Sequence, residues 1–290
     1  MDWRWLGLAW GFSLLGVAVR AVRWRVLLAD LGVHRPLGEL VAWYFVGGFF
    51  NVILPTGFGG DAVRVVELAQ DTSSPDAAVA PRPAWTTVLN SVLVDRYAGV
   101  MVLLAMGLVA GLARPGAAPL SVLGLTAGLF AGGLLVAWLL RRPGWSRWER
   151  RSDPWGRWTR RLRLPALAAA VAPYNRRTIG LALAVSLAFN LLQIGWNVAL
   201  AEGLGLRLPL ATFLVFVPLT AVALLLPAFG GLGVRELTYV GLFGSIGVPQ
   251  ASALALSLGV YVITVATGLV GGVVYLIGGM RRVGRGDRVT

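Results

Sequence analysis

The sequence has no cysteine, no lysine and a single histidine, His34, among its 290 residues. Without cysteine there can be no disulfide, thiol nucleophile or cysteine zinc site. Without lysine there is no phosphate-binding P-loop, and one histidine leaves little for triad chemistry. Charged residues make up only 13% of the chain, about half of what a soluble domain carries. These absences argue against an enzyme, and we expect no metal site and no cofactor.

Apolar residues are abundant instead: 57% of the chain is hydrophobic, and its mean hydropathy is +0.74. They occur in long stretches, and about 20 apolar residues suffice for a helix to cross the hydrocarbon core. The sequence therefore predicts an all-α polytopic membrane protein with about five full spans and two helical hairpins. The predicted spans are Trp5–Val22, Trp85–Leu112, Leu120–Leu140, Ile179–Ala201 and Ala251–Gly279.

Two further apolar segments are interrupted by proline and glycine. Leu37–Leu54 leads into a break at 55–60, and Leu208–Leu226 leads into a break at 227–233. The arm that follows the first break, Asp61–Gln70, would be only about 15 Å long, too short to cross about 30 Å of hydrocarbon. A re-entrant hairpin is expected there. For the second segment, which continues as Val234–Gly247, two full crossings remain an alternative.

The arginines indicate an orientation. All basic residues are arginine, 26 in number, against 13 acidic residues, which gives a net charge of +13. One arrangement places 20 arginines in the cytoplasm and leaves Arg4, Arg114 and Arg207 outside, as the positive-inside rule favours. It puts the C-terminus and the basic loop 141–177 in the cytoplasm, and it predicts that Arg20, Arg23, Trp24 and Arg25 form an interfacial collar. Nucleic acid is not an expected partner.

The two breaks resemble each other. Residues 58–64 and 229–235 share five identities in seven positions, including Arg64 and Arg235. We therefore expect one membrane domain over 1–290, built from a first repeat (5–112), a linking span (120–140), the loop 141–177 and a second repeat (178–279). Because one span separates them, the repeats would have opposite orientations, an architecture that recurs in transporters.

Charged and polar residues at membrane depth predict a polar cavity. A helix that restarts after a glycine turn offers free N–H groups to an anion. Six charges unpaired at the bilayer centre would cost on the order of 15 kcal/mol; they are Asp61, Arg64, Asp95, Arg96, Arg235 and Glu236. Mutual neutralisation of Asp61 and Arg64 is the simpler alternative.

Two stripes of small or polar residues have a similar ambiguity. Ser186, Asn190, Gln193 and Asn197 share one helical face, which would either line the cavity or join helices by hydrogen bonds. Thr264, Gly268 and Gly272 are expected to serve packing.

Four motifs occur in order along the chain: Arg23-Trp24-Arg25, Asn51 to Pro55 running into Gly59 to Arg64, Asp95-Arg96, and Pro227 with Gly230 to Glu236. Together they resemble the flippase-like transmembrane family, the membrane region of lysylphosphatidylglycerol synthases and their stand-alone relatives. The resemblance implies two re-entrant hairpins around a lipid-accessible cavity, and lipid translocation as the activity. An additional N-terminal span, common in that family, is not evident here, and neither is the soluble aminoacyl-transfer domain of the synthases.

The leading hypothesis is a translocase for an anionic phospholipid or a lipid-linked glycan in the bacterial inner membrane. The alternatives are a transporter of a small soluble anion, and a non-transporting partner that binds a cytoplasmic glycosyltransferase or aminoacyltransferase through 141–177. Anionic lipids are the expected partners, and self-association is left open. The predicted substrate-binding residues are Asn51, Pro55, Gly59, Gly60, Asp61, Arg64, Asp95, Arg96, Asn190, Gln193, Pro227, Gly230, Gly231, Arg235 and Glu236.

Overall fold

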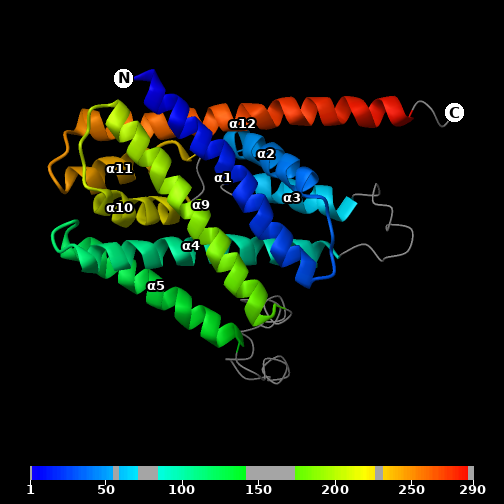
Figure 1. Ribbon diagram of the computed structural model, residues 1–290, viewed down its shortest axis with the longest axis horizontal. Helices are drawn as coiled ribbons and strands as arrows, with labels where there is room; N and C mark the ends of the chain where they lie inside the picture. The colour runs from blue at the N-terminus through cyan, green and yellow to red at the C-terminus, as the bar shows by residue number, and fades with distance from the viewer. Residues whose placement is uncertain (1, 55–58, 71–83, 142–173, 226–230, 287–290) are drawn as a thin grey trace.

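The computed structural model describes residues 2–54, 59–70, 84–141, 174–225 and 231–286. Within these ranges every regular element is a helix, and Figure 1 shows their arrangement. The helices are α1 (Trp3–Asp30), α2 (Leu37–Ile53), α3 (Gly59–Gln70), α4 (Trp85–Ala113), α5 (Leu120–Arg141), α9 (Arg176–Gly203), α10 (Leu210–Ala223), α11 (Val234–Gly244) and α12 (Gln250–Gly286).

Five helices are long and apolar enough to cross a membrane: α1, α4, α5, α9 and the Gln250–Gly278 part of α12. This confirms the five predicted spans and a multi-pass membrane protein. The other helices are shorter, and α2 and α10 are apolar. Their bounds lie close to the four arms predicted on either side of the two breaks.

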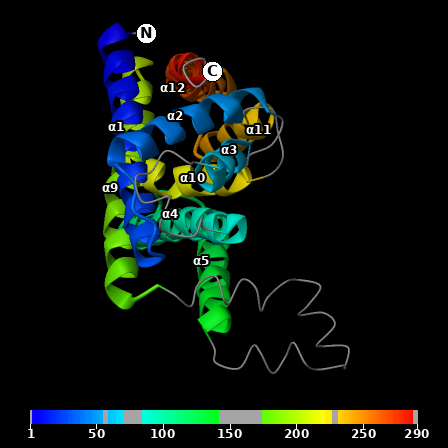
Figure 2. The same cartoon turned by 90° about the vertical axis from the view of Figure 1, so that its right-hand side faces the viewer.

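Helices α1 and α9 run antiparallel, side by side along their whole length (Figures 1 and 2). At one end the Asp2 amide donates to the Gly203 carbonyl over 3.1 Å. At the other end the backbone and side-chain amides of Asn175 both donate to Asp30, each over 2.9 Å. Asn175 also caps α9 by accepting from the Thr178 amide. The two helices are thus fixed to each other at both ends.

Two glycines allow α2 and α3 to pack backbone against backbone. A methyl group added to Gly60 would lie 2.0 Å from the Gly47 carbonyl oxygen, and one added to Gly47 would lie 2.8 Å from that of Gly60. Neither distance leaves room for a side chain, so the close approach of these short helices requires glycine at both positions.

Glycines also seat α12 on α2. A Cβ at Gly271 would lie 1.8 Å from the Phe45 carbonyl oxygen, and one at Gly268 would lie 3.3 Å from that of Gly48. Gly272 faces the ring of Phe49. The packing predicted for Gly268 and Gly272 is confirmed.

In the second half of the chain, α10 packs on α4 and against α11. Gly107 of α4 faces the backbone of α10, where a Cβ would lie 2.9 Å from the Leu214 carbonyl oxygen. The Phe243 ring of α11 contacts two rings of α10, those of Phe213 and Phe216, with centroids 5.7 and 5.1 Å away. This cluster holds α11 to α10. By contrast, α5 lies at the edge of the bundle (Figure 2), and only 6% of its most apolar stretch is buried against the other helices. This is expected of a helix that faces lipid.

The interfacial collar predicted from Arg20, Arg23, Trp24 and Arg25 is wrong. Helix α1 continues for a further turn to Asp30, and Trp24 and Arg23 are only 0% and 3% exposed. The Trp24 indole packs against Trp43 and Tyr44 of α2 and donates to Ser91 of α4. Only Arg25 is exposed. The basic residues alternate between two faces of one helix, which the prediction treated as a single group.

Candidate functional site

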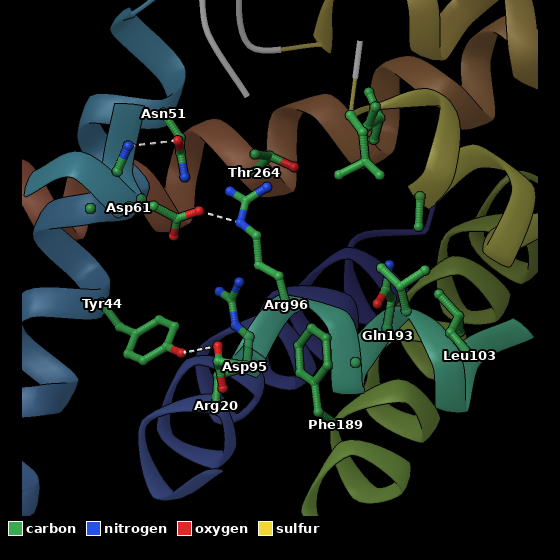
Figure 3. A pocket seen from close by; sticks show the side chains of 18 of the residues that line it. Arg20, Tyr44, Asn51, Asp61, Asp95, Arg96, Leu103, Phe189, Gln193 and Thr264 are labelled. Carbon is green, nitrogen blue, oxygen red and sulfur yellow. Dashed lines mark hydrogen bonds and ion pairs between the residues drawn. The ribbon is translucent and has the colours of Figure 1, made fainter. Parts of the chain in front are cut away.

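A cavity of about 340 Å³ lies where the two halves of the chain meet. Side chains from both halves point into it, as Figure 3 shows for Asp61, Arg96, Gln193 and Thr264. The described charged residues that line it are Arg20, Arg23, Asp61, Arg64, Asp95, Arg96 and Arg235. The uncharged polar ones are Tyr44, Asn51, Asn190, Gln193 and Thr264.

The cavity lies near the middle of three spans. Asp95 is about 15 Å from the start of the 29-residue helix α4. Asn190 lies halfway along α9, and Thr264 lies halfway along the Gln250–Gly278 span of α12. The cavity is therefore near the middle of these three helices rather than at their ends.

Asp95 is the centre of one network of buried side chains. Its carboxylate lies 2.6 Å from Arg23 Nε and accepts a 2.7 Å hydrogen bond from the Tyr44 hydroxyl. Arg23 Nη1 also donates to Ser186 Oγ in α9 over 2.9 Å. Asp95, Arg23 and Ser186 are at most 3% exposed. These contacts link α1, α2, α4 and α9 at the wall of the cavity.

Asp61 is the centre of a second network. It forms ion pairs with Arg64 of the same helix and with Arg96, which reaches from α4 across the cavity (Figure 3). Arg64 also lies 3.9 Å from the Asp95 carboxylate, and its guanidinium carbon lies 4.0 Å from the Tyr44 ring centroid. The predicted pairing of Asp61 with Arg64 is confirmed, but the pair is joined to the cavity lining rather than closed on itself.

Polar residues of α9 have both of the roles considered for them. Asn190 donates to the Gly99 carbonyl over 3.0 Å, and Tyr239 donates to Asn197, so the stripe does join helices. Asn190 and Gln193 also line the cavity. Asn197 lies outside the lining and belongs to the core around α11.

The starts of α3 and α11 differ from the expectation that their amides are open to an anion. The Gly60 amide donates to Asn51 Oδ1 over 2.7 Å. The Gly233 amide donates to Glu236 Oε2 over 2.5 Å. Gly231 and Gly233 have φ angles of 80° and 82°, the left-handed conformation for which glycine was expected at this turn. The protein's own side chains thus satisfy these two amides, and arginine side chains are the cations that face the cavity.

Ten of the fifteen predicted site residues line the cavity: Asn51, Gly60, Asp61, Arg64, Asp95, Arg96, Asn190, Gln193, Gly231 and Arg235. Two described residues, Gly59 and Glu236, are not among its lining residues. Pro55, Pro227 and Gly230 lie outside the described residues, as does most of the loop 141–177.

Sequence reasoning missed Arg20, Arg23, Tyr44 and Thr264 as lining residues. A signal for the two arginines was present: they are three residues apart on one helical face, and the apolar sequence continues beyond them as Val26, Leu27 and Leu28. Tyr44 is a single polar residue within an apolar helix, and no spacing distinguishes it. Thr264 was assigned to packing together with Gly268 and Gly272, but it lines the cavity instead.

The charges of the described lining do not balance. Five arginines and two aspartates give the cavity a net charge of +3. An excess of positive charge at mid-depth is unfavourable unless an anion or water compensates it. Among the described residues, no group of three or more histidine, aspartate or glutamate side chains is placed to hold a metal ion. The described lining of the cavity is therefore electropositive.

The model of one protein family matches most of the chain. That family is described as the lysylphosphatidylglycerol synthase TM region, and the match covers residues 1–272. No curated protein and no solved structure matches the chain significantly. The match includes every residue of the cavity lining described above.

Proposed function

The chain belongs to the lysylphosphatidylglycerol synthase transmembrane-region family, and on that premise we propose that it translocates an anionic lipid across the membrane. The substrate would be an anionic phospholipid or a lipid-linked glycan with a phosphate in its head group. The head group would pass through the cavity while the acyl chains stay in the bilayer. No covalent bond is made or broken in this proposed activity, so it is transport and not catalysis.

One observation carries this proposal: the cavity at mid-span has a net charge of +3 in its described lining. Hydrocarbon resists the passage of a charged head group because the charge loses its hydration. A cavity at mid-depth that holds arginine guanidinium groups replaces part of that hydration with charge-assisted hydrogen bonds. The barrier to crossing is thereby lowered for negatively charged head groups more than for neutral ones.

The packing of the helices supports two repeats. Suppose that α1, α2, α3 and α4 correspond in order to α9, α10, α11 and α12. Each pair of these helices that is in contact then has a counterpart pair that is also in contact. Thus α12 packs on α2 as α4 packs on α10, and α3 packs on α4 as α11 packs on α12. The pair α1 and α9 corresponds to itself. Such reciprocity is expected of inverted repeats, in which α2–α3 and α10–α11 are re-entrant hairpins that meet at the midplane.

The proposed location is the bacterial inner membrane, with the C-terminus in the cytoplasm. Arg20 and Arg23 no longer belong to a cytoplasmic turn, so the count on that side falls from 20 to 18 arginines, against three outside. The asymmetry still favours this orientation.

The proposal is tested with purified protein in liposomes that contain fluorescent phosphatidylglycerol or fluorescent phosphatidylcholine. Transbilayer movement is followed by chemical quenching of the fluorophore in the outer leaflet. We expect phosphatidylglycerol to move faster with protein than without it, and faster than phosphatidylcholine. Movement of neither lipid would contradict the proposal, and uptake of a soluble phosphate without lipid movement would favour the soluble-anion alternative.

Arg235 offers a matched pair of variants for this assay. It lines the cavity and is 4% exposed, whereas Arg207 is exposed in the turn between α9 and α10. Arg235→Gln should slow phosphatidylglycerol movement about fivefold or more, in line with the loss of one charge-assisted hydrogen bond. Arg207→Gln should leave the rate unchanged. Arg64 is less suitable, because its removal would also leave Asp61 with one partner fewer.

A further inference from the structure

Arg20 has surroundings unlike those of the other arginines in the cavity. Its guanidinium carbon lies 5.3 Å from the ring centroid of Tyr44 and 5.1 Å from that of Phe189. Its Nε atom is buried and donates no hydrogen bond to the residues that the structure describes. The two rings stabilise the cation by cation–π attraction, but they accept none of its N–H groups as a carboxylate would.

The carboxylates of the cavity are engaged elsewhere. Asp95 pairs with Arg23 and lies near Arg64, while Asp61 pairs with Arg64 and Arg96. No described carboxylate lies within the 4.0 Å ion-pair distance of Arg20. Arg20 and Arg64 both lie over the Tyr44 ring, so two cations are close together. The buried Nε–H group of Arg20 has no hydrogen-bond acceptor among the described residues.

We infer that Arg20, flanked by Tyr44 and Phe189, is the subsite that binds one phosphate oxyanion in this cavity. A guanidinium group presents its N–H donors in a planar fork that matches two oxygens of a phosphate. The aromatic neighbours restrict the side chain and keep water from part of it, which strengthens the contact with an anion. Arg23, Arg64 and Arg96 instead position helices and set the background positive charge.

This assignment rests on the proposed function for the source of the phosphate, a lipid head group. A free phosphate ester has the same oxyanion chemistry, so the test includes both sources. Binding is measured rather than movement, which keeps this inference separable from the proposed transport.

The experiment measures binding to the full-length protein in detergent by native mass spectrometry. The probes are dioleoyl phosphatidylglycerol, dioleoylglycerol, which has the same acyl chains but no phosphate, and soluble glycerol phosphate. Arg20→Gln should weaken phosphatidylglycerol binding about tenfold, as expected for one lost charge-assisted contact, and leave dioleoylglycerol binding unchanged. Arg25→Gln is the matched control, because Arg25 lies on the same helix but is exposed and outside the lining.

Arg20→Lys keeps the charge but loses the fork, and it should weaken phosphatidylglycerol binding about threefold. It decides the question if Arg20→Gln does not fold. Glycerol phosphate that binds in an Arg20-dependent way would support the phosphate subsite and extend it to soluble esters. The inference is overturned if both Arg20 variants bind phosphatidylglycerol as the unmodified protein does, or if they lose dioleoylglycerol equally.

Results of this binding assay and of the liposome assay can differ. Arg20-dependent binding without lipid movement would contradict the proposed function and leave the subsite intact. Lipid movement that is unchanged in Arg20→Gln would contradict the subsite and leave the proposed function intact.

Discussion

The Arg23 guanidinium of α1 lies 2.6 Å from the Asp95 carboxylate of α4, and the two side chains are only 4% and 2% exposed. This ion pair connects two membrane spans that are far apart in the sequence. A buried pair of this kind contributes little net stability as a unit, because desolvation offsets the attraction. The pair therefore matters for the cavity mainly because it fixes where the two side chains lie, and less because of the net stability that it adds.

Replacement of one partner should be costly. Asp95→Asn removes the carboxylate and leaves Arg23 as an uncompensated buried charge, which we expect to lower the free energy of unfolding by about 3–5 kcal/mol. Denaturant or thermal unfolding in detergent measures the change. Tyr44→Phe is the milder comparison, because it removes only one hydrogen bond to the same carboxylate, about 1 kcal/mol.

The double variant Arg23→Gln with Asp95→Asn discriminates between a stabilising contact and an uncompensated charge. It removes both charges together, so it should be more stable than Asp95→Asn alone. If the two substitutions instead add their costs, Arg23 and Asp95 do not act as a pair.

The sequence was sufficient to predict the spans and most of the charged and polar residues of the cavity lining, for a physical reason. Apolar length reports on membrane crossing, and charge inside an apolar stretch reports on a polar interior, so Asp95 and Arg96 were found. Arg20 and Arg23 were misplaced because positive charge near the end of a span also indicates an interface. Only the actual end of α1 at Asp30 decides between these two locations.

The helix starts show a second limit. A glycine break predicts free amides, but whether a side chain caps them depends on contacts that local sequence does not reveal. Asn51 is nine residues before Gly60 and caps it only because α3 packs against α2. Glu236, three residues after Gly233, is a local cap that the sequence pattern could have indicated.

Gly60 and Gly48 provide a sharp test of the α2–α3 packing. Gly60→Ala would place a methyl group 2.0 Å from a backbone oxygen, whereas an alanine at Gly48 meets nothing within 4 Å. Gly60→Ala should destabilise the protein by about 1–3 kcal/mol and slow lipid movement, because α3 carries Asp61 and Arg64. Gly48→Ala should have little effect on unfolding. Equal effects of the two alanines would mean that the helices do not pack as closely as described.

Variants of Asn197 and Gln193, which share one face of α9, should distinguish an effect on stability from an effect on transport. Asn197 is 2% exposed and accepts from Tyr239, so Asn197→Ala should cost about 1–3 kcal/mol of stability without changing lipid selectivity. Gln193→Leu should do the reverse, because Gln193 lines the cavity. Unfolding curves and liposome rates for both variants check this. A shared loss of stability and rate in each variant would contradict the separation.

Arg96 is suited to test whether positive charge, rather than shape, determines selectivity. Its side chain is 26% exposed, and Asp61 keeps Arg64 as a partner when Arg96 is lost. Arg96→Gln lowers the net charge of the described lining from +3 to +2 without leaving a buried carboxylate alone. Phosphatidylglycerol movement should slow about fivefold, the order expected of one charge at short range, while phosphatidylcholine movement should stay the same. Arg96→Lys should restore most of the rate, and Arg114→Gln, an exposed change at the end of α4, should have no effect. If Arg96→Gln slows both lipids alike, Arg96 acts through the structure of the cavity and not through its charge.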